Sequence, residues 1–285
     1  DFLVITSIIF SKDRPLQLDL CLNSIKQNFN DSNKIIVIDR YSSKYKSSLE
    51  NLQEEHQDVT FYSQTKSLYK DLKDWILLSK NSYVCFFTDD DIFFTNFSAA
   101  ESYDKIFNGP FAVWCFSLRL GLNITSRWHQ GQRGDDKAVA YHDAGDIMLV
   151  PKTRYNYGSY WSYSHSVDGH IFRKGDAIRM VSELYFLDQT FTLKQTPNAL
   201  EENMQRFWAI SQNTIACPKR SVVVNSPNNR VSDTHEENKS GEKFDLSPAY
   251  LLEIYKRGGR VDVNKLDFGH IECPHQEMNI LKGLE

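Results

Sequence analysis

Strand-like apolar runs and segments with helical spacing of apolar residues alternate over the first hundred residues. Continuous apolar runs at 2–10, 34–40, 59–64 and 82–91 are typical of strands buried on both faces. Between them lie stretches with helical spacing of apolar residues, such as Leu16, Leu20, Ile25 and Phe29. This pattern predicts an α/β fold, in which a mostly parallel sheet is flanked by helices and joined by right-handed crossovers.

After residue 100 the alternation becomes looser. We expect strands at 111–121, 143–152 and 220–225, a polar loop at 123–136, and a helix at 247–259. The segment 155–173 is rich in Tyr and Ser, which favours a binding segment. A further helix should start near Pro197, with Asn198 as its N-cap and Glu201 completing a capping box. No linker interrupts the chain, so we expect a single continuous domain.

Composition narrows the possible partners and location. The 285 residues carry a formal net charge of -4, which argues against nucleic acid as a partner. No apolar run is long enough to span a bilayer, although a position next to a membrane stays open. The five cysteines are widely spaced, without a CxxC pair, which favours buried thiols in a reducing compartment. We therefore expect a cytoplasmic protein.

Polar clusters follow the ends of the first four predicted strands. In a parallel sheet, ligands bind beyond the carboxyl ends of the strands, so these clusters should converge on one crevice. The clusters are Ser11 to Arg14, Asp39 and Arg40, Gln64 to Lys66, and Asp89 to Asp91. The three aspartates need compensation, because neighbouring carboxylates repel one another and are costly to desolvate. Either a divalent cation such as Mn²⁺ or Mg²⁺ or plain exposure in a turn would provide it.

The first hundred residues resemble the nucleotide-binding half of a glycosyltransferase with the GT-A fold, and are most similar to the family 2 enzymes. The matching stretches are "SIIFSKDRPLQLDLCLNSI", "IIVIDRYS" and "LYKDLKDWILLSKNSYVCFFTDDD". The resemblance implies a Rossmann-type sheet, with residues 1–100 binding the donor and residues 101–285 binding the acceptor and carrying catalysis. It also implies transfer of a sugar from a nucleotide-diphosphate sugar donor to a hydroxyl of a glycan or glycolipid, as in polysaccharide biosynthesis.

The resemblance assigns roles at the donor end of the crevice. Asp89 and Asp91 match the Asp-x-Asp ligands of a Mn²⁺ or Mg²⁺ ion, and Asp90 would face the donor ribose or sugar. Asp39 matches the acid that contacts the nucleotide base, although "RYSS" after it departs from the usual small turn. The third metal ligand would be His235, with His275 as the alternative. Ser11, Arg14 and Lys66 also lie at the ends of predicted strands, where they could contact the donor. The cations of Arg14 and Lys66 would neutralise the charge of its diphosphate.

An inverting transferase needs a carboxylate to accept the proton of the acceptor hydroxyl. By resemblance, Glu201 or Glu202 matches this base, and Asp168 of "SVDGHIFR" is the third candidate. A role of Glu201 in the capping box would explain that residue equally well. Aromatic residues around Trp128 and Trp161 could stack on sugar rings, and core packing explains them too.

Two other functions remain open from the sequence. A nucleotidyltransferase also places carboxylates and metal beside a sugar nucleotide, but that class usually has a Gly-rich basic loop after the first strand, and "SKDRPLQL" lacks glycine. The other is an inactive carbohydrate- or nucleotide-binding module on the same fold. The intact acidic run argues against such a module.

Overall fold

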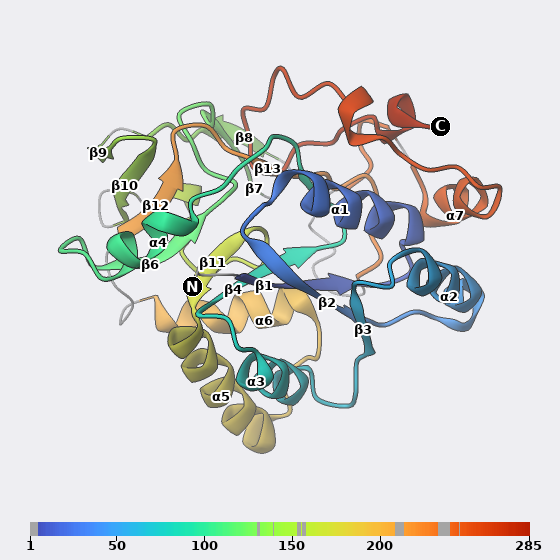
Figure 1. The fold of residues 1–285 in the computed structure, drawn as a ribbon, viewed down its shortest axis with the longest axis horizontal. Helices are drawn as coiled ribbons and strands as arrows, with labels where there is room; N and C mark the ends of the chain where they lie inside the picture. Colours follow the sequence, from blue (N-terminus) through green and yellow to red (C-terminus); the bar gives the residue numbers. More distant parts are fainter. Residues whose placement is uncertain are drawn as a thin grey trace.

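A nine-stranded sheet runs through the computed structural model (Figure 1). The structure describes residues 5–129, 132–138, 140–152, 155, 158–208, 214–232, 240–244 and 246–285. The strand order is β3-β2-β1-β4-β11-β6-β12-β10-β9. Strands β11 and β10 pair antiparallel with both of their neighbours, so they run against the other seven. The predicted α/β class with a mostly parallel sheet is therefore confirmed.

The first hundred residues form the parallel part of this sheet, close to the predicted boundaries. Strand β1 (Ile5–Ser11) pairs in parallel with β2 (Ser32–Asp39) on one side and with β4 (Tyr83–Thr88) on the other. Strand β3 (Thr60–Ser63) pairs in parallel with β2. Because these strands run in one direction, their carboxyl ends meet at one edge, as the sequence predicts.

Five strands after residue 100 complete the same main sheet. Strand β11 (His170–Arg173) lies between β4 and β6 (Val113–Ser117), and β6 pairs in parallel with β12 (Thr214–Pro218). The sheet ends in β10 (Ile147–Pro151) and β9 (His142–Ala144). The proposed division into 1–100 and 101–285 stays a prediction, but strands from both parts share one sheet.

Helices cover both faces of the sheet (Figure 1). One layer contains α1 (Pro15–Asn28), α2 (Lys46–Glu55) and α7 (Pro248–Lys256), and α1 contacts both of the others. The other layer contains α3 (Leu68–Leu78), α5 (Lys174–Phe191) and α6 (Pro197–Met204). A shorter helix, α4 (Ala100–Phe107), precedes β6. Among the described residues, no helix has the length and apolar character needed to cross a membrane.

The second half corrects several sequence-based expectations. Residues 123–136, expected as a loop, contain a hairpin of β7 (Ser126–His129) and β8 (Gln132–Asp135). Within 155–173, Trp161 is fully buried and donates through Nε1 to the carbonyl of Asp136, so it belongs to the core. Strand β13 (Val223–Asn225) leaves the main sheet and pairs antiparallel with β5 (Asp91–Phe93). That pairing sets Asn225 opposite Asp91.

The expected capping box at α6 is wrong. The N-cap is Thr196, whose hydroxyl accepts a hydrogen bond from the backbone N–H of Ala199. Pro197 takes the first helical position, where its missing N–H costs nothing, and this moves the cap two residues ahead of Asn198. Glu201 therefore lies too far along the helix to complete a capping box.

Candidate active site

Of the three aspartates after β4, Asp89 and Asp91 are buried and Asp90 is largely shielded from solvent. Asp89 is 3% exposed and Asp91 is 1% exposed, and the side chain of Asp90 is 10% exposed. An exposed turn, one of the two explanations for this run, is therefore excluded. Each carboxylate must instead be stabilised by protein donors, by a cation, or by both.

Arg14 provides one buried cation for this cluster. Its Nη1 donates to Asp89 Oδ1 at 2.9 Å and to Asp90 Oδ2 at 2.8 Å. Its Nε donates to Asn229 Oδ1 at 2.9 Å, which fixes the plane of the guanidinium. Arg14 was expected to face the donor diphosphate, and in this structure it is paired with the aspartates.

The turn between β1 and α1 places these groups. Asp13 has φ 55°, a left-handed conformation, and its Oδ1 accepts a hydrogen bond from the backbone N–H of Ser42 at 2.7 Å. Pro15 then begins α1. From the end of β1, the Ser11 hydroxyl and the Lys12 backbone N–H both donate to Asp89 Oδ2, at 2.8 and 3.1 Å. Asp89 is thus bound on both oxygens.

A second set of donors surrounds Asp90 and Asp91. The Thr88 backbone N–H donates to Asp91 Oδ2 at 2.8 Å, and the Thr88 hydroxyl lies 2.8 Å from Asp90 Oδ1. Asn225 Nδ2 donates to Asp90 Oδ1 at 2.9 Å and to Asp91 Oδ1 at 3.1 Å. The antiparallel pairing of β5 with β13 therefore has a direct role in building the site.

Asp168 joins the same cluster. Its Oδ1 lies 2.9 Å from the Thr88 hydroxyl, which also contacts Asp90, so one hydroxyl bridges two carboxylates. Its Oδ2 accepts from Arg119 Nη1 at 3.2 Å, and Arg119 is only 1% exposed. Of the three candidate bases, Asp168 is the one that a single described hydroxyl, that of Thr88, links to the aspartate run.

His275, the alternative third ligand, also lies at this cluster. Its Nε2 is 3.1 Å from Arg119 Nη1, which can only donate, so Nε2 accepts and the hydrogen is on Nδ1. His275 Nδ1 lies 3.1 Å from Asn225 Oδ1. Burial, together with the positive charge of Arg119, lowers the pKa of His275 to about 4, so the ring is neutral at neutral pH.

Glu201 contacts the segment 166–168, which carries Asp168. Its Oε1 accepts a hydrogen bond from the backbone N–H of Val167 at 3.2 Å. Burial, reinforced by the charge of Asp168, raises the pKa of Glu201 to about 7. Such a group can accept or hold a proton near neutral pH, and its position is not explained by helix capping.

The charges fit a divalent cation. Four carboxylates, those of Asp89, Asp90, Asp91 and Asp168, meet two guanidinium groups, those of Arg14 and Arg119. Among the ion pairs of the described residues, this leaves an excess of two carboxylates in the cluster. Burial raises the pKa of Asp89 to about 6 and that of Asp91 well above its usual value. Carboxylate oxygens are the ligands that Mg²⁺ and Mn²⁺ prefer.

The remaining predicted site residues are farther from the cluster. Asp39 is 3% exposed, its carboxylate accepts from the Ser63 hydroxyl at 3.2 Å, and burial raises its pKa. Lys66 and Glu202 are exposed, and no hydrogen bond or ion pair described here joins either to the aspartates. His235 lies outside the described residues.

Several residues of the site were not singled out from the sequence. Arg119 lies within the apolar stretch "FSLRLG", where a buried charge is itself a signal of a functional pair. Asn225 ends the run "SVVVN", as the polar clusters end the first four strands. Thr88 and Asn229 carry no such signal, because Thr and Asn are common in strands and turns.

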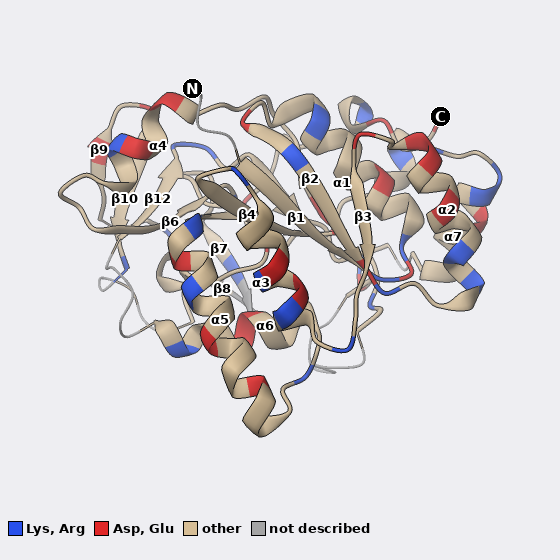
Figure 2. Ribbon diagram, turned by 60° about the horizontal axis from the view of Figure 1, so that its bottom comes forward, with Lys and Arg blue, Asp and Glu red and all other residues tan. Residues whose placement is uncertain are grey.

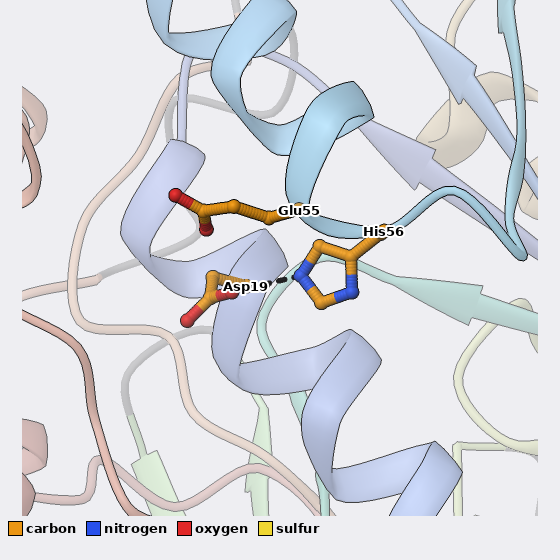
Figure 3. A group of neighbouring side chains, drawn as sticks. All are labelled: Asp19, Glu55 and His56. Carbon is orange, nitrogen blue, oxygen red and sulfur yellow. Dashed lines mark hydrogen bonds and ion pairs between the residues drawn. The ribbon is translucent and has the colours of Figure 1, made fainter.

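Among the described residues, one group of three His, Cys, Asp or Glu side chains brings its ligand atoms within 4.8 Å of one another, and it lies away from the aspartate cluster (Figure 3). The group consists of Asp19, Glu55 and His56, and His56 Nε2 lies 2.8 Å from Asp19 Oδ1. Two cations already contact the group. Lys26 Nζ lies 2.9 Å from His56 Nδ1, and Arg260 pairs with Glu55. We interpret this group as a structural connection between α1, α2 and the C-terminal segment.

The fold and the cluster together define a class of protein: an α/β protein with a buried acidic centre at the carboxyl edge of its parallel strands. No family model matches the chain, and no curated protein matches it. Solved structures that resemble it include S. aureus TarS 1-349, at a TM-score of 0.46 and 10% identity over 79% of this chain. The same protein in complex with UDP also has a TM-score of 0.46.

Another similar structure is that of the mannosyltransferase PcManGT from Pyrobaculum calidifontis in complex with GDP-Man and Mn²⁺. Its TM-score is 0.43, with 12% identity over 81% of this chain and 59% of that one. The chain spans 61% of the length of TarS 1-349. The side chains of the acidic centre, and not these distant likenesses, define what the site can do.

Proposed function

We propose that this protein is a metal-dependent glycosyltransferase that moves a sugar from a nucleotide-sugar donor to an acceptor hydroxyl. One observation carries the proposal: the aspartates at the end of β4 are buried together with Asp168 and share the Thr88 hydroxyl with it. Such a centre would supply the carboxylate ligands of a metal ion from the aspartate run. It would also supply a separate carboxylate, that of Asp168, as a general base in the same hydrogen-bonded group. We infer a nucleotide-sugar donor from the resemblance of the first hundred residues to the GT-A glycosyltransferases.

Asp91 and Asp89 are the residues that would hold Mn²⁺ or Mg²⁺. His275 lies at the cluster, but its Nε2 accepts from Arg119 and would have to give up that bond to bind a metal, and His235 lies outside the described residues. When bound, the cation would neutralise the charge of the leaving diphosphate. Asp90 contributes charge at the same place, and Arg14 holds Asp89 and Asp90 in position. Asn225 orients Asp90 and Asp91 from the other side.

Asp168 is the favoured general base. Its Oδ1 contacts the Thr88 hydroxyl beside the aspartate run, and its Oδ2 is held by Arg119 Nη1. Glu201 adjoins Asp168 and has its pKa raised to about 7, mainly by burial, so it is the second candidate. A carboxylate that accepts the acceptor proton while the donor's diphosphate leaves fits an inverting reaction.

A glycan or glycolipid hydroxyl is the proposed acceptor. The ring centre of Tyr160 lies 5.3 Å from the Arg119 guanidinium carbon, and that of Tyr163 lies 5.9 Å from it. The same guanidinium pairs with Asp168. Aromatic rings bind the apolar faces of sugars well. These two side chains are therefore the proposed walls for the acceptor sugar.

The test is a thermal-shift panel of UDP- and GDP-sugars with and without Mn²⁺, because a ligand of the native state raises the melting temperature by mass action. A Mn²⁺-dependent shift with one donor supports the proposal, and Asp91→Asn should abolish it. The control is Asp143→Asn, an exposed acid that pairs with Lys219. Absence of a shift with every nucleotide sugar, with Mn²⁺ present, would contradict the proposal.

A further inference from the structure

A cavity of about 450 Å³ lies at the C-terminal end of α1, and none of the described residues that line it belongs to the acidic centre. Its lining comes from three parts of the chain: Asn28 and Phe94, then Arg220, and then the segment 263–269. In both ribbon views the C-terminal part of the chain lies on the same side of the molecule as α1 and α7 (Figures 1 and 2). The volume is within the range of about 300–1,000 Å³ that is usual for small-molecule sites.

Two aromatic rings form part of the apolar lining. The ring centres of Phe94 and Phe268 lie 5.1 Å apart, and the planes of the rings differ by 18°. Val263 and Leu266 complete the apolar lining, and both are nearly inaccessible to solvent. An aromatic and aliphatic surface of this kind packs well against the C–H groups of a sugar ring.

Asn28 adds a hydrogen-bond acceptor to the same lining. The residue is 8% exposed, and its Nδ2 donates to the carbonyl of Phe93 at 2.7 Å. Because a carbonyl can only accept, this bond fixes which end of the amide is the nitrogen. Among the described residues, no donor bonds to Asn28 Oδ1. A nearly buried acceptor in a cavity lining favours a ligand with a hydroxyl or another donor.

Arg220 is the single charged side chain among the described residues of the lining. It is exposed, and no hydrogen bond or ion pair with another described residue holds its guanidinium. Its backbone is closely packed, because a Cβ on Gly121 would lie 2.7 Å from the Arg220 Cα. Asn123 also bonds to the backbone N–H and the hydroxyl of Ser221, at 2.9 and 2.8 Å. The guanidinium donors are therefore available to a ligand and are anchored on a fixed backbone.

The charge around the cavity favours a neutral ligand over a strongly anionic one. Asp262 and Asp267 lie in or next to the segment that lines the cavity, although neither lines it. Asp262 Oδ1 accepts from the Asn264 backbone N–H and Asp267 Oδ1 from the Gly269 backbone N–H, each at 2.9 Å. These two acids offset the charge of Arg220, which leaves its guanidinium as a set of hydrogen-bond donors.

We propose that this cavity binds one pyranose ring of a glycan. Sugar hydroxyls both donate and accept hydrogen bonds, so they match Asn28 Oδ1 as an acceptor and the Arg220 guanidinium as a donor. The C–H face of the ring packs against Phe94 and Phe268. A single sugar ring makes few contacts, so the binding is weak and reversible.

Strand β5 joins the cavity to the acidic centre. Asp91 begins this strand and Phe94 follows its last residue, so the two lie about 10 Å apart at roughly 3.3 Å per residue. A sugar bound in the cavity would hold an acceptor chain close to the site of transfer. This consequence rests on the proposed function, whereas sugar binding in the cavity does not.

The test is a titration of the ¹⁵N-labelled full chain, followed by NMR, with methyl glucoside, N-acetylglucosamine and glucuronic acid in turn. We expect the neutral sugars to shift the signals of the Asn28 side-chain amide and the Arg220 Nε–H. Arg220→Ala should reduce the affinity by roughly five- to tenfold, and Phe268→Ala by roughly tenfold. Asp91→Asn should bind the sugars like the wild type, although it loses binding of the nucleotide-sugar donor.

The matched controls are Arg257→Ala and Phe111→Ala, which remove an exposed arginine and an exposed phenylalanine outside the described lining. Both should bind the sugars like the wild type. The proposal would be overturned if no sugar shifted the two signals at tens of millimolar, or if Arg220→Ala and Phe268→Ala bound as tightly as the wild type. Shifts with glucuronic acid and inorganic phosphate but with neither neutral sugar would also overturn it, since the cavity would then be an anion site. So would loss of sugar binding in Asp91→Asn, which would place the sugar at the acidic centre.

Discussion

Arg14 and Asp89 are joined by a hydrogen-bonded ion pair of 2.9 Å although 75 positions separate them in the chain. Both side chains are nearly inaccessible to solvent, at 9% and 4% exposure. The ion pair links the N-terminus of α1 to the C-terminal end of β4. It also shows that part of the charge of the aspartate run is compensated from within the protein, before any metal is bound.

Replacing Arg14 with Gln should destabilise the metal-free protein strongly. Removal of one partner of a buried ion pair typically costs about 3–5 kcal/mol, because the other charge stays buried. Mn²⁺ should then raise the melting temperature of the variant more than that of the wild type, since the ion supplies the missing positive charge. The control is Arg179→Gln, which removes an exposed pair with Glu183. Equal Mn²⁺ shifts in wild type and Arg14→Gln would argue against a cation at this cluster.

Asp91→Asn and Asp89→Asn should each abolish metal-dependent donor binding while the protein stays folded. Asn keeps the size of the side chain and one acceptor oxygen, but it loses the charge that holds a hard cation. For Asp91 the loss of charge also removes the cost of a buried carboxylate, whose pKa burial raises well above its usual value. Titration of the donor by calorimetry, with and without Mn²⁺, measures the effect. Unchanged Mn²⁺-dependent affinity in both variants would refute the metal assignment.

Glu201 should make the protein less stable as the pH rises. Its pKa is raised from 4.5 to about 7, so the folded state keeps a proton that the unfolded state releases. The stabilisation is complete below about pH 4.5 and is lost as the pH rises through about 7, with a scale of roughly 1–3 kcal/mol. His275 acts in the opposite sense, because its pKa is lowered to about 4.

The measurement for Glu201 is therefore the difference in unfolding free energy between wild type and Glu201→Gln across that range. The variant should lack the Glu201 contribution and gain stability relative to the wild type as the pH rises. A difference that is independent of pH would show that Glu201 does not titrate in this window.

Turnover numbers of single variants should identify which of the three candidate carboxylates is the general base. Asp168→Asn is expected to reduce turnover by about 10²–10⁴, the usual effect of losing general base catalysis, with donor affinity nearly unchanged. Glu202→Gln should have little effect, because Glu202 is exposed on α6. Single-turnover kinetics with saturating donor make the comparison. Near-normal transfer by Asp168→Asn, with Glu201→Gln folded, donor-binding and inactive, would move the base to Glu201.

The parallel half of the fold could be predicted because local pattern determines it. The apolar runs around Ile8, Val37 and Phe86 can only be strands buried on both faces, and parallel strands bring their carboxyl ends together. Ser11, Arg14 and Asp89 were therefore correctly placed at one edge. The run alone does not distinguish buried aspartates from exposed ones, since Asp is also common in exposed turns.

The other residues of the site depend on contacts between distant segments. Asn225 reaches Asp91 because β13 pairs with β5, and His275 reaches Asn225 through a later loop. Neither pairing leaves a periodic signal in the sequence. The cap at Thr196 shows the same limit on a smaller scale, because Asn198 fits the capping pattern equally well and only the position of Pro197 in the helix decides between them.

The position of His275 late in the chain also sets an order of events during synthesis. The segments of β1, β2 and β4 emerge from the ribosome before Asn225 and His275 are synthesised. The ion pair of Arg14 with Asp89 can therefore form first. Before residue 225 has been made, Asp90 and Asp91 lack the hydrogen bonds from Asn225. Between residues 225 and 275, Asn225 still lacks its contact with His275. A growing polypeptide would thus carry an unfinished acidic centre until residue 275 has been made.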